Sequence, residues 1–134
     1  SGKMGLKPCM RLVTTVSTIK FYEPGTSISY GRRYVTDKRT RMGVLAIGYA
    51  DGLPRIISNK CSFAAPGGFA PQRGSICMDM CMIDVTGIDC KENDTAILFD
   101  ENHSIEKIAE SCNTIAYEIL TSFSPRVKRI YFQE

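Results

Sequence analysis

Short runs of β-branched and apolar residues, each ended by a turn signal, recur along this sequence. Residues 11–17 are rich in Val and Thr, and residues 19–22 continue the pattern up to a turn centred on Pro24 and Gly25. Residues 42–49 are almost all apolar, which indicates a buried central strand. Many short strands separated by turns are typical of sandwiches and barrels. We therefore predict one mainly β domain with a barrel-like or sandwich-like sheet.

The remaining pattern adds further strands and one short helix. Strands are also predicted over residues 27–35, 61–65, 75–85, 94–99 and 126–132. The helix is predicted over 105–112, where apolar side chains recur at helical spacing and Ser104 can cap the first turn. A single further helical turn is predicted at 114–118.

The composition is that of an ordinary globular domain. The chain has 134 residues, of which 43% are apolar and 23% charged, and its formal net charge is +3. Its basic residues form no stripe with interleaved aromatics, so we expect no nucleic-acid partner. No apolar run approaches the ~20 residues of a membrane span and no signal peptide is visible, so we expect a cytoplasmic protein without membrane contact. Residues 1–6 are predicted to be a flexible start or a cloning remnant, and 7–134 the folded domain.

Six cysteines occur, at positions 9, 61, 77, 81, 90 and 112, and none forms a C-x-x-C pair. A disulfide framework is possible by number alone. A chain of this size can bury a core without crosslinks, however, so we predict reduced thiols. Cys77 and Cys81 are expected on one face of the 75–85 strand, but no further ligand pair accompanies them, and we predict no metal site. The single histidine, His103, lies in a polar loop and is expected to be solvated surface.

Three tyrosines are candidates for chemistry: Tyr30 precedes Gly31, Tyr49 follows Gly48, and Tyr117 lies in the second predicted helical turn. Glycine at a strand end permits close approach by a ligand or another chain. A phenol can hydrogen-bond a phosphate, and it can act as an acid or base if cationic neighbours lower its pKa from ~10. Packing area with a satisfied hydroxyl is the alternative role for each tyrosine. The sequence contains no G-x-x-x-x-G-K loop, no G-x-G-x-x-G and no G-x-S-x-G elbow.

Five short motifs occur in a fixed order along the chain. They lie at residues 29–31, 47–52 with Arg55, 74–80, 114–120 and 126–129. The first reads Ser-Tyr-Gly and the third reads Gly-Ser-Ile-Cys-Met-Asp-Met. In this order and spacing the sequence resembles the C-terminal domain of alanine racemases, from about Lys7 to Phe132. Each motif alone is modest, but the ordered set of five is specific.

The resemblance implies a fold-type III racemase that uses pyridoxal phosphate. In that family an N-terminal (β/α)8 barrel holds the cofactor on a lysine. The C-terminal β-domain covers the barrel mouth of the second subunit of a homodimer. Such enzymes interconvert the amino acids L- and D-alanine, the latter for cell-wall precursors. A barrel of this kind takes ~250 residues, so the chain is implied to be only part of the enzyme. Without the cofactor lysine it is expected to be inactive alone and to bind no cofactor.

The resemblance also assigns roles to residues of this sequence. Tyr30 is implied to be the catalytic base that takes the α-proton from the L-isomer, on the face opposite the cofactor lysine. Tyr117 is implied to bind the cofactor phosphate. Met78 is implied to seat the substrate carboxylate through its backbone N–H, and Tyr49 to form the inner gate of the substrate access channel. The polar residues of that channel are implied to be Asp79 and Arg55.

Three points stay open at the level of sequence. Ser75 stands where many of these racemases carry an arginine, which leaves the electrostatics of the access channel open, although an exposed serine there could carry no functional meaning. A serine racemase of the glycopeptide-resistance type resembles the same domain, and the barrel would be needed to separate it from an alanine racemase. A stand-alone β-domain that serves as a non-catalytic interaction module is the remaining alternative.

Overall fold

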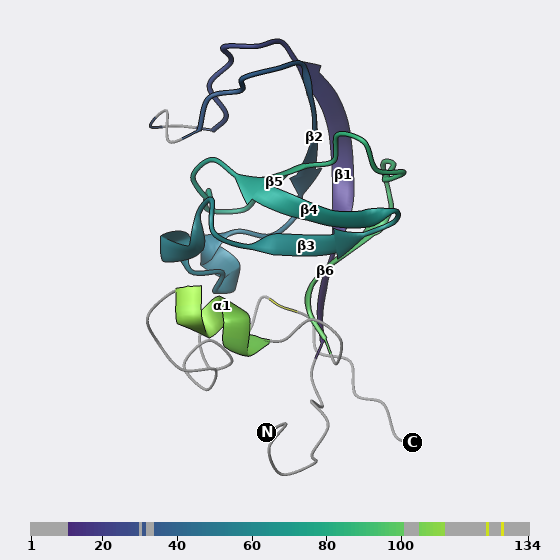
Figure 1. Ribbon diagram of the computed structural model, residues 1–134. Coiled ribbons are helices and arrows are strands. Elements are labelled where there is room, and N and C mark those ends of the chain that lie inside the picture. The colour runs from purple at the N-terminus through teal and green to yellow at the C-terminus, as the bar shows by residue number, and fades with distance from the viewer. Residues whose placement is uncertain are drawn as a thin grey trace.

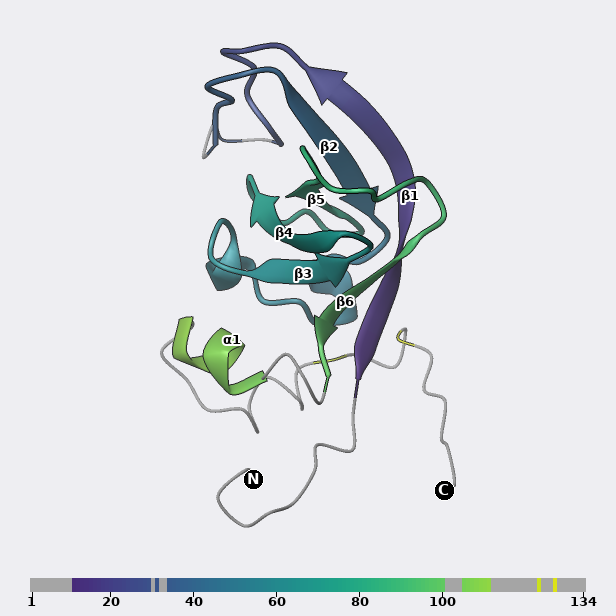
Figure 2. The same ribbon diagram turned by 45° about the vertical axis from the view of Figure 1, so that its right-hand side comes forward.

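A computed structural model of the protein describes residues 11–29, 31, 34–100, 105–111, 123 and 127. In this part of the chain six antiparallel strands close into a barrel, in the order β1-β2-β5-β4-β3-β6 (Figures 1 and 2). The predicted mainly β fold is confirmed, and the sheet takes the barrel form rather than the sandwich form. The strands are β1 (Leu12–Tyr22), β2 (Thr40–Leu45), β3 (Ser62–Ala65), β4 (Gly68–Arg73), β5 (Cys81–Asp84) and β6 (Thr95–Phe99).

The longest strand, β1, pairs with both of its neighbours in the closed barrel. Its first part, residues 12–15, pairs with β6, and its second part, residues 16–22, pairs with β2. The register is irregular where the two parts meet, as expected where one strand bends to stay within a closed sheet. The sequence predicted two strands here, over 11–17 and 19–22, and the structure joins them into one.

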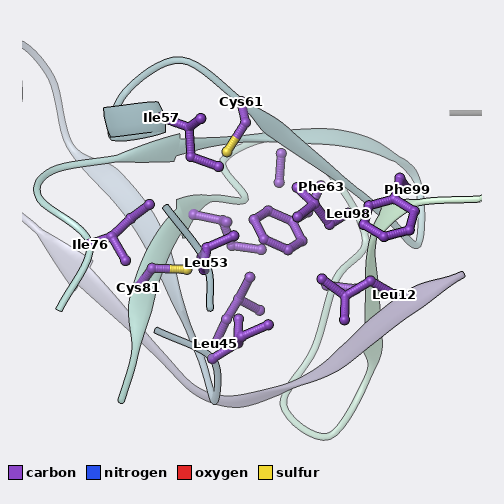
Figure 3. Close-up of a cluster of buried hydrophobic side chains, with 14 of the residues drawn as sticks. Leu12, Leu45, Leu53, Ile57, Cys61, Phe63, Ile76, Cys81, Leu98 and Phe99 are labelled. Atoms are coloured by element: carbon purple, nitrogen blue, oxygen red, sulfur yellow. The ribbon is translucent and has the colours of Figure 1, made fainter. Parts of the chain in front are cut away.

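The barrel interior is filled by apolar side chains from every strand. Phe63 on β3, Ile83 on β5 and Leu98 on β6 are fully buried, and Leu12 and Leu45 contribute from β1 and β2 (Figure 3). Side chains from the connections complete this core: Leu53, Ile57 and Ile76. Removal of apolar surface from water is the dominant favourable term in folding, so the same core that stabilises the barrel also fixes these connections to it.

The connection between β1 and β2 does not contain the strand predicted over 27–35. Ser27 and Val35 pair with each other in an isolated antiparallel bridge, so the chain reverses between them. Ser29 and Gly31 both have left-handed backbone, with φ of +64° and +77°, which lies outside the range of a strand. The alternating pattern comes instead from the arms of a turn, one of which buries Ile28 against the barrel.

The strongly apolar run 75–85 is a strand only over its last part, β5. Residues 75–80 form an irregular segment, so the prediction that Cys77 and Cys81 share one strand face is wrong. The run is apolar because Ile76 enters the core from this irregular segment. Periodicity alone does not separate a strand from a buried segment of another kind.

The strand β2 also ends earlier than predicted, at Leu45 instead of residue 49. A 3₁₀ helix, η2 (Tyr49–Asp51), follows, and a second one, η3 (Arg55–Ile57), lies further along the same connection. Neither was predicted. The apolar run extends beyond the strand because Ile47 is buried in the core although it lies outside the sheet.

Most of the other predicted elements agree with the structure where it describes them. The strands β3 and β6 each begin one residue after the predicted start. The strand β4 was not predicted, and its Pro71 is a residue that argues against a strand. The helix α1 (Ile105–Ser111) begins where predicted. Residue 112, the turn at 114–118 and His103 lie outside the described residues. Of the strand predicted over 126–132 only Val127 is described, and it lies in a bend.

Four of the cysteines can be placed, and Cys61, Cys77, Cys81 and Cys90 are free thiols. Cys9 and Cys112 fall outside the described residues, so the reduced state of all six stays a prediction. In the described ranges no group of three or more His, Cys, Asp or Glu side chains could hold a metal ion. No helix among those residues is long and apolar enough to cross a membrane.

The buried thiol of Cys81 is expected to make the stability of the fold depend on alkaline pH. Burial of Cys81, followed by its proximity to Cys61 and Cys77, raises its pKa well above the ordinary value of 9.0. Above that pH the thiol ionises in the unfolded chain but not in the folded one, so the folded state binds more protons. The Cys81 thiol should therefore contribute no pH dependence below about pH 9, and above it should lower the free energy of unfolding by up to about 1.4 kcal/mol per pH unit.

Urea unfolding between about pH 7 and pH 10 measures this dependence. The variant Cys81→Val removes the titrating group and keeps an apolar side chain, so its slope above pH 9 should be smaller than that of the wild type. An equal slope in both proteins would contradict the assignment to Cys81.

Candidate active site

Residues 75–80, here called the hub segment, connect β4 to β5 and hold the candidate residues together. The hub segment makes hydrogen bonds with three stretches of chain: the connection between β1 and β2, the η2 turn, and the η3 turn. Figure 1 shows these connections gathered beside the barrel, on the side away from β1. Residues that are distant in the sequence are therefore brought to one surface.

Tyr49 is held against the hub segment by its backbone. Its N–H donates to the Cys77 carbonyl at 2.9 Å, and the N–H of Ala50 donates to the Met78 carbonyl at 2.9 Å. This pair of bonds places the start of η2 alongside Met78. The Tyr49 residue is 39% exposed, so its side chain is available to a ligand or to another chain.

Gly48 permits this close approach because it has no side chain. A Cβ atom at this position would lie 2.2 Å from the Cys77 carbonyl oxygen and 2.4 Å from that of Met78. The backbone of Gly48 is extended, with φ of −149°, so lack of space rather than backbone conformation requires glycine here. Its N–H donates to Asp51 Oδ2 at 3.0 Å, which closes the η2 turn. The position of Tyr49 is thus set by its neighbour as well as by its own hydrogen bond.

Arg55 is linked to the hub segment through Ser58. The Ser58 hydroxyl accepts a hydrogen bond from the Ile76 N–H at 3.0 Å and donates to the Arg55 carbonyl at 2.7 Å. The Arg55 guanidinium lies 5.7 Å from the centroid of the Tyr49 ring, within the range of a cation–π contact. Arg55 and Tyr49 therefore share one surface.

Met78 and Asp79 occupy the exposed tip of the hub segment. Met78 is 53% exposed, and Asp79 is exposed as well. The Met78 carbonyl is occupied by Ala50, whereas within the described part of the chain the Met78 N–H has no hydrogen-bond partner. An unpaired N–H, a phenol and a guanidinium on one surface are donors suited to a carboxylate.

The connection that carries Tyr30 also contacts the hub segment. The Ser29 hydroxyl donates to the Ser75 carbonyl at 2.8 Å and lies 3.2 Å from Cys77 Sγ. Because Ser29 immediately precedes Tyr30, the point at which the chain reaches Tyr30 is tied to the hub segment. Tyr30 itself and Tyr117 lie outside the described residues.

Ser75 is buried, so the expectation of an exposed serine at this position is wrong. The residue is 2% exposed, and among the described residues its hydroxyl has no hydrogen-bond partner. Its neighbour Ile76 enters the core, which draws this part of the hub segment inward. In this chain position 75 contributes its backbone carbonyl to the site, through the bond from Ser29.

Several residues that build the site were not singled out from the sequence. Ser29 and Ser58 tie their loops to the hub segment. The fully buried Gln72 accepts a hydrogen bond from the Asn59 N–H at 2.7 Å and donates to the Gly74 carbonyl at 2.9 Å. The contacts of Ser58 and Asn59 cross long stretches of sequence, so no local pattern marks them. Ser29 alone had a signal, which is its place beside Tyr30 in the first motif.

The fold and this surface define a small β-barrel domain that presents hydrogen-bond donors and aromatic and apolar side chains on loops beside the barrel. Comparison with known proteins names the family. The family described as alanine racemase, C-terminal domain, matches residues 9–131. The chain therefore belongs to the alanine racemase C-terminal domain family.

Relatives and solved structures agree with this family. The chain is 44% identical over 135 residues to an alanine racemase from Halothermothrix orenii, and the match covers 97% of this chain and 36% of the relative. The structure of the alanine racemase from Streptomyces coelicolor is similar with a TM-score of 0.94 at 34% identity, over 99% of this chain and 36% of that one. A crystal structure of alanine racemase from Bartonella henselae with covalently bound pyridoxal phosphate is similar with a TM-score of 0.86 at 35% identity, over 91% and 34% of the two chains. The chain thus spans about a third of the length of the proteins it matches.

Proposed function

We propose that this chain is the C-terminal domain of a pyridoxal-phosphate-dependent alanine racemase, which interconverts L- and D-alanine and supplies D-alanine for cell-wall precursors. One observation supports the proposal most directly. The loops that carry the described candidate residues are hydrogen-bonded to the hub segment, and so is Ser29, the residue before Tyr30. Membership of the alanine racemase C-terminal domain family supports it, and the relatives compared above are alanine racemases.

The chemistry requires two bases on opposite faces of the substrate, because a proton must leave on one side and return on the other. Pyridoxal phosphate, when bound, draws electrons from the substrate and so makes its α-hydrogen acidic. Tyr30 takes that proton from the L-isomer and returns one when the reaction runs toward L-alanine. The opposite face is served by the cofactor lysine, which belongs to the N-terminal barrel domain.

The residues on the described surface bind and orient the substrate. The unpaired Met78 N–H seats the substrate carboxylate, and the exposed Tyr49 forms the inner gate of the access channel. Arg55 and Asp79 provide the polar walls of that channel. These donors fit the carboxylate of an amino acid held beside the cofactor. The cofactor phosphate is assigned to Tyr117.

The active site is shared between two subunits of a homodimer. The C-terminal domain of one subunit covers the barrel mouth of the other, so Tyr30 and the cofactor lysine come from different chains. Exposed apolar side chains beside the polar donors support such an interface, because clusters of this kind are normally covered by another chain. They are Tyr49, Ile56, Met78 and Met80, exposed by 39%, 56%, 53% and 44% respectively.

Subunit mixing in the full-length enzyme tests the shared site. One subunit carries Tyr30→Phe, and the other has its cofactor lysine in the barrel replaced by Ala. In the mixed dimer one of the two sites combines an intact lysine with an intact Tyr30. Each parent dimer should therefore be nearly inactive, and the purified mixed dimer should regain about half of the wild-type activity by the additive rule for independent sites.

The control is a mixed dimer in which one subunit carries both substitutions and the other is wild type. Each of its two shared sites lacks either the lysine or Tyr30, so this control should be nearly inactive. If the first mixed dimer stays inactive while this control is active, Tyr30 serves its own subunit and the shared site is refuted. The 134-residue chain alone, incubated with pyridoxal phosphate and L-alanine, should produce no D-alanine. Measurable D-alanine would show that catalysis does not require the barrel domain and its lysine.

A further inference from the structure

The turn that carries Tyr30 is closed by its own backbone on both arms. The Ile28 N–H donates to the Tyr34 carbonyl at 2.9 Å, and Ser27 and Val35 form the antiparallel bridge just outside it. Residues 29 and 34 therefore lie on the two arms of this turn, one on either side of its tip. Contacts that fix residues 29 and 34 therefore fix both arms of the turn relative to the barrel.

Ser29 holds the first of these points through its hydroxyl. Besides the 2.8 Å bond to the Ser75 carbonyl, the hydroxyl lies 3.2 Å from Cys77 Sγ. Ser29 also has φ of +64°, a left-handed conformation that side chains other than glycine, asparagine and aspartate adopt rarely. Such a conformation persists only where surrounding interactions determine it, and the bond to the hub segment is the interaction available here.

Arg73 holds the second point through the ring of Tyr34. Its guanidinium lies 5.2 Å from the centroid of that ring, a geometry in which a cation is attracted to an aromatic face. Arg73 is the last residue of β4 and pairs with Met82 of β5, so its backbone belongs to the rigid barrel. Its Nε is buried and, in the part of the chain that the structure describes, has no hydrogen-bond partner.

The two contacts lie on either side of Gly74, where the turn meets the barrel directly. A Cβ atom at Gly74 would lie 2.7 Å from the Ile28 carbonyl oxygen and 3.1 Å from Ser29 Cβ. No side chain fits between Gly74 and the turn, so the backbone of the turn packs directly against the backbone at the end of β4. Two side-chain contacts flanking one close backbone contact restrict both sliding and rotation of the turn.

We propose that Ser29 and Arg73 are positioning residues that set the place of Tyr30 relative to the substrate. The proposal rests on the proposed function, in which Tyr30 is the base for the L-isomer. Neither residue needs to touch the substrate, because each acts through the turn. Loss of either contact should therefore weaken proton transfer on the Tyr30 face and leave the lysine face largely intact.

The test uses the full-length dimeric enzyme with its cofactor and measures exchange of the α-deuterium from L- and D-alanine. Ser29→Ala keeps the Cβ atom and removes only the hydroxyl, and Arg73→Met keeps the length of the side chain and removes its charge. A displacement of about 1 Å can cost about 10²-fold in rate, so exchange from the L-isomer should fall by about 10- to 10²-fold. Exchange from the D-isomer should stay within about 2-fold, and Arg73→Lys, which keeps the cation, should recover most of the loss.

Matched controls exist at contacts that involve neither the hub segment nor Gly74. Ser17→Ala removes a hydroxyl that donates to the Val44 carbonyl at 3.2 Å, and Arg39→Met removes a guanidinium that lies 4.2 Å from the centroid of the Phe21 ring. Both should leave exchange from the two isomers unchanged. Thermal melting and cofactor absorbance confirm that each variant is folded and loaded. If Ser29→Ala does not fold, the Arg73→Met and Arg73→Lys pair decides the question by itself.

The outcomes separate this proposal from the one on which it rests. A loss confined to the L-isomer in the Ser29 and Arg73 variants supports the positioning role. Equal loss from both isomers, or no loss, overturns it, even if Tyr30→Phe in the same series loses exchange from L-alanine alone. If Tyr30→Phe itself leaves exchange from both isomers unchanged, the proposed role of Tyr30 fails and the positioning role fails with it.

Discussion

Replacing Tyr30 with Phe in the full-length enzyme is expected to lower racemisation by about 10²–10⁴-fold, the usual effect of deleting a general acid or base. The substitution removes the hydroxyl and keeps most of the ring area, so folding should change little. Racemisation needs both bases, and both directions should therefore slow. Exchange of the α-deuterium distinguishes the two faces: it should be lost mainly from L-alanine, because the cofactor lysine still serves the D-isomer.

Tyr22→Phe is the matched control, because Tyr22 lies at the end of β1 and belongs to the barrel instead of the site. It should retain exchange from both isomers. Near wild-type exchange from both isomers in Tyr30→Phe would refute its assignment as the base. A loss accompanied by a marked drop in melting temperature would identify Tyr30 as a structural residue.

The substitution Gly48→Ala should disturb the site nearly as strongly, although Gly48 makes no contact with substrate in the proposed mechanism. The new Cβ would lie 2.2 Å from the Cys77 carbonyl oxygen, and hydrogen bonds hold the backbones of both segments in place. Overpacking of this kind typically costs about 1–3 kcal/mol of stability. The η2 turn would have to move by about 1 Å, and kcat/KM should fall by about 10²-fold.

Gly43→Ala provides the comparison for that experiment, since Gly43 is also a buried glycine without left-handed backbone. Its new Cβ would meet Val16 Cγ1 at 3.3 Å and Ile83 Cγ1 at 3.4 Å. Side-chain atoms can give by a few tenths of an ångström, so this variant should keep most of its activity and stability. Steady-state kinetics and urea unfolding of both variants test the difference. Equal effects would show that the clash with the Cys77 carbonyl does not account for the loss in Gly48→Ala.

The sequence predicted the class of fold because strand periodicity and turn residues are local signals. Residues 42–45 and 95–99 were recognised as strands for this reason. The closure of the barrel could not be predicted, since it depends on β1 pairing with two different strands. The hub segment was mistaken for a strand because burial of Ile76 in a loop produces the same apolar pattern as burial in a sheet.

For the site, recognition depended on motifs rather than on physical pattern. The sequence named Tyr49, Arg55, Met78 and Asp79, and the structure brings their loops together. It did not name Ser58, whose hydroxyl joins Arg55 to Ile76, because such contacts exist only after folding. Arg73 was overlooked for the same reason: its partner Tyr34 lies on another connection, and nothing local to β4 identifies the ring.

The hydrogen bonds that join the hub segment to the other connections use mainly its main-chain atoms, namely the carbonyls of Ser75, Cys77 and Met78 and the N–H of Ile76. Every amino acid supplies the same carbonyl, and every one except proline supplies the N–H. Substitutions along the segment can therefore alter the lining of the active site without dismantling its scaffold. Position 75 illustrates this: its carbonyl accepts the hydrogen bond from Ser29, whereas its own hydroxyl has no hydrogen-bond partner among the described residues. The hydrogen bonds that place this segment are thus less sensitive to sequence than the side chains that the segment exposes.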